Sequence, residues 1–81
     1  MAGRAKVPDE LQRLTKSQLL TVIDESTLGL ENTIIAKRTL IDRWPQVDIA
    51  VEIGYDRSAI SHRLPAIYDR LIYIAGKLNM H

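Results

Sequence analysis

The side chains best suited to chemistry lie in one short stretch, and their types favour binding over catalysis. Residues 57–63 read RSAISHR and contain no aspartate or glutamate. Guanidinium and imidazole groups donate hydrogen bonds to guanine acceptors and phosphates, and hydroxyls suit base edges or the DNA backbone. We therefore predict that DNA is contacted by Arg57, Ser58, Ser61, His62 and Arg63. The base readers among them are expected to be Arg57 and His62.

A tyrosine and two basic residues outside this stretch complete the predicted DNA contacts. Tyr55 lies just ahead of it and reaches a phosphate if its hydroxyl is exposed. Lys37 and Arg38 lie in an earlier helical segment. There they either contact phosphates or form a merely solvated face, which is the commoner role of such a pair.

The sequence offers no set of side chains for an enzyme or a metal site. Its two histidines, His62 and His81, have no partner at metal-ligand or catalytic-triad spacing. There is no cysteine, and the four glycines stand apart rather than in a phosphate-binding loop. We therefore expect a non-enzymatic protein that uses no metal and no cofactor.

The elements that would position the binding residues form a helix-turn-helix over residues 46–64. An apolar stripe from Ile49 to Ile53 has helical spacing, and Gly54 interrupts it. Glycine tolerates the positive φ that a tight turn between crossing helices tends to demand. The pattern therefore predicts helices at about residues 45–53 and 57–64.

Two more helices are predicted upstream. A capping box at Thr15 and Gln18 predicts a helix that runs to about residue 27. A further apolar pattern predicts a helix at about residues 30–43. Trp44 after it is expected to pack in the core or at the hinge between helices, and not to stack on a ligand. The fold is expected to be all-α, a small bundle of four to five helices that contains the helix-turn-helix.

The first residues are predicted to form an arm at residues 1–13, ahead of a single domain at residues 14–81. Pro8 disfavours a helical conformation at the residue before it. Arg4 and Lys6 then belong either to a solvated tail or to a basic arm that follows a DNA groove.

Pro65 separates the binding stretch from the last predicted element. Because proline lacks an N–H and disfavours helix at the preceding residue, a separate or strongly kinked helix is expected at about residues 65–78. Apolar residues lie on more than one side of that segment, so a second copy of it is expected to cover the surplus. The predicted homodimer interface contains Tyr68, Leu71, Ile74 and Leu78.

One set of spaced residues resembles the helix-turn-helix of small phage repressors: Gln46, Ala50, Gly54 and the run Ser58-Ala59-Ile60. Residues 14–78 are also similar to the short sigma-70 region 4-like proteins of phages and mobile elements of Gram-positive bacteria, in which a segment like IIAKRTLIDRW precedes the motif. The resemblance implies a sequence-specific DNA-binding regulator whose recognition helix is at residues 57–64. Pro65 and the small number of Lys and Arg on the reading face depart from the family pattern.

Length and charge limit these hypotheses. Eighty-one residues allow one domain, and eleven Lys and Arg against ten Asp and Glu give a net charge of +1, whereas many DNA-binding domains are strongly basic. DNA binding then requires segregated charge, so four acidic residues are expected to lie away from the recognition helix: Asp24, Glu25, Asp48 and Glu52.

No apolar run approaches the ~18 residues of a membrane span, and the first residues lack an apolar leader. A cytoplasmic protein without membrane contact is expected.

Two functions follow from this sequence. The leading hypothesis is a transcriptional regulator, encoded by a phage or mobile element, that binds double-stranded DNA as a homodimer with residues 57–64 in the major groove. The alternative is a non-enzymatic protein-binding module on the same scaffold, which inhibits or modulates a host protein such as polymerase or a defence enzyme. Near-zero net charge and apolar C-terminal surface favour this alternative. Acidic residues crowding Arg57 and His62 would remove most support for the DNA hypothesis.

Overall fold

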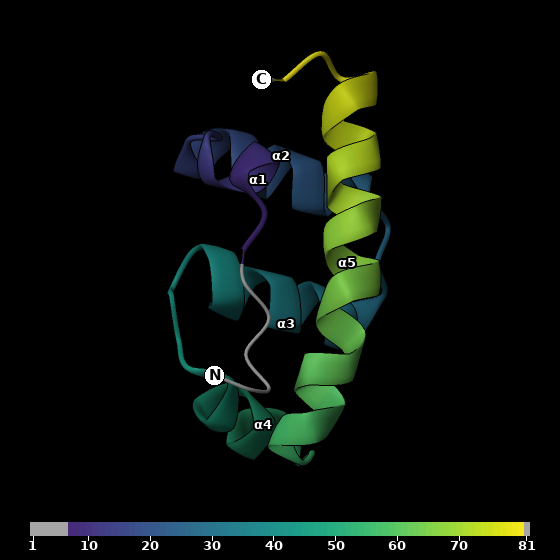
Figure 1. The fold of residues 1–81 in the computed structure, drawn as a ribbon. Helices are drawn as coiled ribbons and strands as arrows, with labels where there is room; N and C mark the ends of the chain where they lie inside the picture. The colour runs from purple at the N-terminus through teal and green to yellow at the C-terminus, as the bar shows by residue number, and fades with distance from the viewer. Residues whose placement is uncertain (1–6, 81) are drawn as a thin grey trace.

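The computed structural model describes residues 7–80, and in that part of the chain every regular element is a helix. The all-α prediction is therefore confirmed. In chain order the elements are α1 (Asp9–Gln12), α2 (Lys16–Glu25), α3 (Leu30–Leu40), α4 (Gln46–Ile53) and α5 (Arg57–Lys77), as Figure 1 shows.

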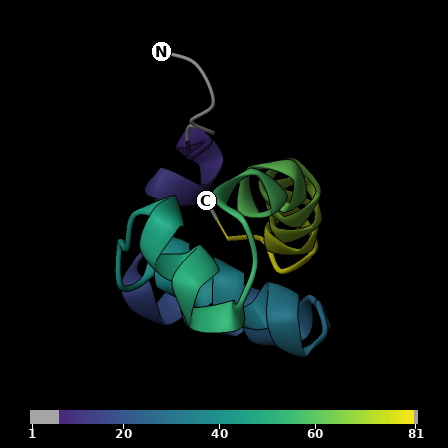
Figure 2. The same cartoon turned by 90° about the horizontal axis from the view of Figure 1, so that it is seen from below.

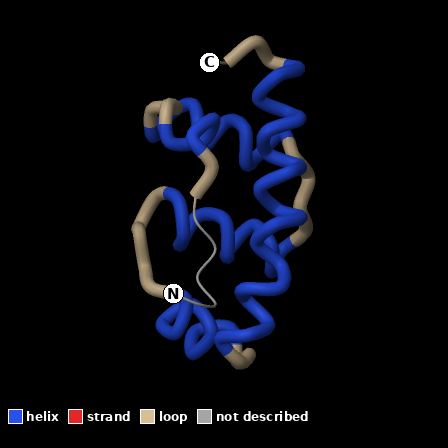
Figure 3. The backbone as a smooth tube through the Cα atoms, in the orientation of Figure 1, coloured by secondary structure: helices blue, strands red, loops and turns tan. Residues whose placement is uncertain are grey.

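Helix α5 is the longest element, and the other four pack along it. In Figures 1 and 3, α1 and α2 lie beside its C-terminal part, α3 beside its middle and α4 beside its N-terminal end. Viewed from below in Figure 2, the shorter helices all lie on one side of α5. The opposite side of α5 is consequently left to solvent.

Local chemistry accounts for several of the helix boundaries. Thr15 Oγ1 accepts from the backbone N of Gln18 at 3.1 Å, and Gln18 Oε1 accepts from the backbone N of Thr15 at 2.9 Å. This is the predicted capping box at the start of α2. Gly54 ends α4 with φ +77° and ψ 30°, the left-handed conformation that the predicted turn requires.

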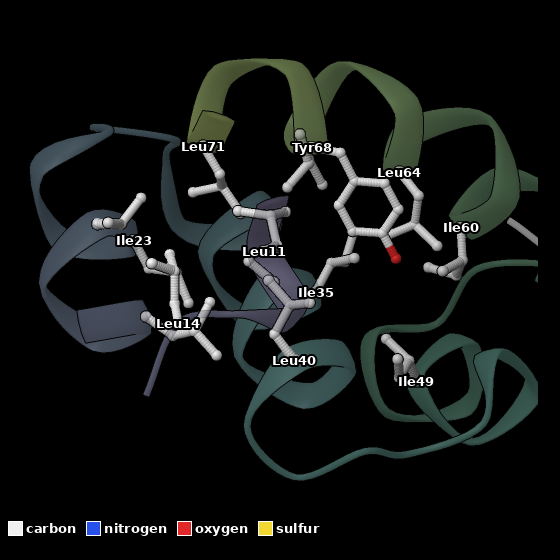
Figure 4. Close-up of a cluster of buried hydrophobic side chains, with 14 of the residues drawn as sticks. Leu11, Leu14, Ile23, Ile35, Leu40, Ile49, Ile60, Leu64, Tyr68 and Leu71 are labelled. Carbon is white, nitrogen blue, oxygen red and sulfur yellow. The ribbon is translucent and has the colours of Figure 1, made fainter. Parts of the chain in front are cut away.

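A single apolar core runs through the bundle and draws on every helix. Figure 4 shows Leu11 of α1 pointing into this core beside Leu71 of α5 and Leu40 of α3. Leu11 is only 1% exposed, and Val7 packs against the same core. Residues 7–13 therefore belong to the folded domain, and the predicted arm extended too far along the chain. The arm's basic residues Arg4 and Lys6 lie outside the described residues.

Helix α5 continues through Pro65, so the prediction of a separate last helix is wrong. A proline inside a helix costs about 3 kcal/mol. Buried side chains on both sides of it offset that cost, because each Leu or Ile contributes about 1.5–3 kcal/mol on burial. These residues are Ile60, Leu64, Ile67 and Leu71, all at most 1% exposed. Pro65 itself is exposed, and Figure 1 shows the first turns of α5 leaning toward α4.

Candidate nucleic-acid interface

Helices α4 and α5 are joined by a turn of three residues, 54–56, whose geometry is fixed at both ends. Gly54 supplies the left-handed step, and the backbone O of Asp56 accepts from the backbone N of Ala59 at 3.0 Å to begin α5. Ser61 Oγ donates to Gln46 Oε1 at 2.6 Å, which joins the first turn of α4 to the second turn of α5. Ser61 is therefore part of the support for the turn, not an exposed DNA contact as predicted.

Beyond this turn, the first half of α5 presents an exposed polar surface. Arg57, Ser58 and His62 are all exposed, as their predicted role requires. Farther along, Pro65 and Ala66 are exposed too, and no acidic residue occurs in the sequence between Asp56 and Asp69. We call Arg57, Ser58 and His62 the reading face.

Arg63 and Tyr55 were predicted to contact DNA, but in the structure both form hydrogen bonds with residues of α3. Arg63 Nη1 donates to Glu31 Oε1 at 3.0 Å and to Asn32 Oδ1 at 3.2 Å, and its guanidinium carbon lies 4.7 Å from the centre of the Tyr55 ring. The Tyr55 hydroxyl donates to the same Glu31 oxygen at 2.7 Å. We call these four residues the Glu31 cluster. It fastens the turn and α5 to the first turn of α3.

The cluster has an electrostatic signature at Glu31. Hydrogen bonds from Tyr55 and then from Arg63 hold the pKa of the Glu31 carboxyl below its usual value. The same contacts raise the pKa of Arg63, so the pair is ionised at neutral pH. Because its charge is matched by Glu31, Arg63 adds little attraction for phosphate, and its predicted DNA contact is not supported.

Arg38 also forms hydrogen bonds within the protein, in this case with a residue of α4. Its Nε and Nη2 donate to the two carboxylate oxygens of Glu52, each at 2.9 Å, and Nη1 donates to Asp42 Oδ2 at 2.8 Å. The guanidinium carbon lies 4.4 Å from the centre of the Trp44 ring. We call Arg38, Asp42, Trp44 and Glu52 the Arg38 cluster. It clamps α3 to α4, and a planar guanidinium suits both the bidentate pair and the stacked ring.

These contacts occupy the Arg38 guanidinium and so do not support its predicted phosphate contact, whereas its neighbour Lys37 is exposed. Hydrogen bonding to Arg38 lowers the pKa of Glu52. Trp44 is 37% exposed and lies outside the core; it packs against Arg38 between α3 and α4, which is the hinge alternative of its predicted role. Of the two phosphate contacts predicted in α3, only the Lys37 side chain is exposed and forms no hydrogen bond or ion pair with the described residues.

Charge around the turn is nearly balanced. Residues 46–66 contain Arg57 and Arg63 against three carboxylates, Asp48, Glu52 and Asp56, a net charge of 2 − 3 = −1. Glu52 forms an ion pair with Arg38 of α3, at 2.9 Å. Asp56 directly precedes Arg57. Long-range attraction for DNA is consequently weak, and affinity would have to come from direct contacts.

The predicted dimer interface is largely buried inside one copy of the chain. Leu71 is 0% exposed and Tyr68 4%, because the other helices of the bundle cover this side of α5. Ile74 packs partly against the same core, and Leu78 remains 39% exposed. Tyr68 and Leu71 cannot join copies of this fold, and their assignment to an interface is wrong.

Sequence reasoning missed an exposed apolar pair on α4. Val51 is 76% exposed and Val47 52%. They lie four residues apart, a spacing that places them on one helix face. The signal was present in the sequence, since neither valine belongs to the apolar stripe of Ile49, Ala50 and Ile53.

Comparisons with protein-family models, with curated proteins and with solved structures found no match to this chain. Among residues 7–80, no helix is long and apolar enough to cross a membrane. The same residues contain no group of three or more side chains that could hold a metal ion.

Proposed function

We propose that this protein is a sequence-specific DNA-binding regulator that places the first turns of α5 in the major groove. The observation that carries the proposal is the reading face, three exposed hydrogen-bonding side chains directly behind a rigid turn. Recognition helices in helix-turn-helix proteins contact base edges with their N-terminal residues. The resemblance of residues 14–78 to sigma-70 region 4-like proteins supports the same function.

Each residue of the reading face is assigned a DNA contact that suits its side chain. Arg57 is the guanine reader, because a guanidinium matches the two acceptors of guanine in the major groove. His62 contacts a guanine acceptor or a phosphate, and Ser58 a base or a phosphate. Lys37 supplies a phosphate contact from α3. Arg63, Tyr55 and Arg38 act as positioning residues, since their bonds hold α5 and α4 against α3.

The proposal is tested by selecting bound duplexes from a random pool and sequencing them. An enriched motif of a few base pairs is expected for one copy, and a two-fold repeat at about one helical turn if two copies bind together. Absence of enrichment at low salt would overturn the proposal.

Variants of the protein, tested with the enriched duplex, then show which residues contact DNA. Arg57→Ala should cost about 1–3 kcal/mol of discrimination at one base pair, and His62→Ala should weaken binding with an unchanged circular dichroism spectrum. Lys77→Ala is the matched control, because this exposed cation lies at the other end of α5. Equal loss for Lys77→Ala would mean that binding follows overall charge and not the reading face.

A protein-binding module is the second candidate, and the Val47 and Val51 pair favours it. Two valines exposed on one face of α4 form an apolar surface that the bundle leaves uncovered. The net charge of −1 around the turn also suits a protein partner better than DNA. Val51→Ser should leave duplex binding intact if DNA is the partner. The second candidate would be favoured if Arg57→Ala bound its partner as tightly as the parent does, while Val51→Ser bound that partner more weakly.

A further inference from the structure

Helix α4 has an exposed face that is partly apolar and partly acidic. Val51 lies four residues after Val47 and three after Asp48, so the three side chains lie on one side of the helix. Val47 is 52% and Val51 76% exposed, and Asp48 is exposed without an ion pair to any described residue. Residues 44–56 contain no Lys or Arg. We call Val47, Asp48 and Val51 the acidic face.

The C-terminal part of α5 has a second exposed face, of the opposite charge. The Tyr73 ring is 56% exposed, and its centre lies 5.9 Å from the guanidinium carbon of Arg70 and 5.6 Å from Nζ of Lys77. Both cations are exposed, and neither forms an ion pair with a described carboxylate. Residues 70–80 contain no Asp or Glu, although Asp69 directly precedes them. We call Arg70, Tyr73 and Lys77 the basic face.

The two faces complement each other in charge and in their apolar parts. The acidic face sets an unpaired carboxylate beside two valines, and the basic face sets an aromatic ring between two cations. Tyrosine and arginine are enriched at the centres of protein interfaces, and opposite charges around them favour the correct partner. The acidic face therefore suits a basic partner with an exposed aromatic ring, and this chain carries such a surface itself.

A single copy cannot join its own two faces, because they lie at opposite ends of the molecule. Figure 1 shows α4 beside the N-terminal end of α5, whereas residues 70–77 form the C-terminal end of that helix. Contact between the two faces consequently requires a second copy of the chain.

We propose that the acidic face of one copy binds the basic face of another, with Tyr73 against Val47 and Val51 and a cation paired with Asp48. A contact between unlike faces leaves one face of each kind free on a pair, so further copies can add unless the assembly closes. An interface this small implies weak association, with a Kd of about 0.1–1 mM. The proposal names a partner for the valine pair and does not rest on DNA binding, because it uses no residue of the reading face.

Sedimentation velocity of the full chain tests the proposal. Between about 10 µM and 1 mM protein the average mass should rise from that of a monomer. Raising the salt concentration from about 50 to 500 mM should lower that mass, because screening weakens the charge pairs. A monomer mass at millimolar protein, or association that salt leaves unchanged, would overturn the proposal. Copies stay separate at nanomolar protein, so Lys77→Ala keeps its role as a control for DNA binding.

Two serine variants distinguish a contact between unlike faces from a symmetric one. Val51→Ser and Tyr73→Ser should each weaken association about tenfold, with unchanged circular dichroism spectra because both side chains are exposed. An equimolar mixture of the two variants should associate more strongly than either alone, because Val51→Ser retains a basic face and Tyr73→Ser retains an acidic face. A symmetric interface would instead leave one variant associating like the parent, which would overturn the proposal.

Leu30→Ser is the matched control for these variants. Leu30 is 79% exposed, belongs to neither face, and loses a comparable apolar side chain on substitution. Its association should equal that of the parent. A tenfold loss in Leu30→Ser as well would assign association to general surface hydrophobicity and overturn the proposed contact.

Discussion

The two halves of α5 differ in how they are held, although they form one continuous helix. In residues 57–64 only Ile60 and Leu64 are buried, and hydrogen bonds to Gln46 and Glu31 supply the other attachments. Residues 65–77 are held mainly by apolar packing, with four buried side chains: Ile67, Tyr68, Leu71 and Ala75. A side-chain hydrogen bond to another segment adds to this packing, from Arg70 Nε to the backbone O of Ser26 at 3.1 Å. Polar fastening leaves the first half with an exposed face, whereas packing against α1 and α2 makes the second half an anchor.

This difference implies that stability and recognition can be changed separately. Truncating buried side chains of the anchor should destabilise the fold, because apolar burial dominates the folding free energy. Truncating side chains of the reading face should alter binding and leave the fold intact, since exposed side chains contribute little to stability. The predictions below test this separation, starting from the largest expected effect.

Leu71→Ala should cause the largest loss of stability in the anchor. A fully buried leucine replaced by alanine typically costs about 2–5 kcal/mol, which is a large part of the stability of a domain this small. Chemical denaturation followed by circular dichroism measures it. Tyr73→Ala is the control in the same half, because that side chain is 56% exposed. Similar losses for both variants would contradict the picture of an apolar anchor.

Alanine at two glycines should change stability in opposite directions. Gly54 has φ +77°, so Gly54→Ala should cost about 1 kcal/mol and Gly54→Val more, through backbone strain alone. A Cβ at Gly54 or at Gly76 would have no other atom within 4 Å, so neither substitution causes a clash. Gly76 lies inside α5 without a positive φ, so Gly76→Ala should stabilise by about 0.5–1 kcal/mol. Thermal melts of the two alanine variants that shift in the same direction would contradict the proposed turn.

Short-range features were predictable from the sequence. The capping box of α2 and the left-handed Gly54 depend on residues a few positions apart, and both are present in the structure. Exposure of Arg57, Ser58 and His62 followed from the same local pattern. The i,i+4 spacing of Arg38 and Asp42 was also readable, but Arg38 was considered only with Lys37, as a phosphate contact or a solvated face.

Long-range pairings were not predictable, because helical spacing does not show which helices meet. Arg63 and Glu31 are 32 residues apart, and Arg38 and Glu52 are 14 apart. The continuity of α5 was missed for a related reason. The local penalty of Pro65 is visible in the sequence, whereas the packing that offsets it depends on all four of the other helices.

The polar fastening of the first half should make stability depend on acid pH. The folded chain holds the pKa values of Glu31 and Glu52 below the ordinary 4.5, so their contribution is present above pH 4.5 and is lost as pH falls through the lowered values. Melting temperature measured against pH should therefore fall on the acid side. Glu31→Gln should flatten part of that fall, and Glu25→Gln, an exposed control in α2, should not. Parallel acid curves for both variants would show that the Glu31 cluster does not fasten α5.

The smallest effect is expected at a buried, unpaired hydroxyl inside the anchor. The Tyr68 hydroxyl is buried, has no hydrogen-bond partner among the described residues, and points toward Ile49 and Ile60 in Figure 4. Tyr68→Phe removes that unpaired group and keeps the ring, so stability should stay unchanged or rise by about 1 kcal/mol. Burial also raises the pKa of Tyr68 above the ordinary 10.0, and the unfolded chain ionises first as pH rises. The parent should therefore lose stability above pH 10 through this group, whereas Tyr68→Phe should lose less. Urea denaturation at neutral and alkaline pH measures both effects, and a clear loss of stability in Tyr68→Phe at neutral pH would show that the hydroxyl has a partner after all.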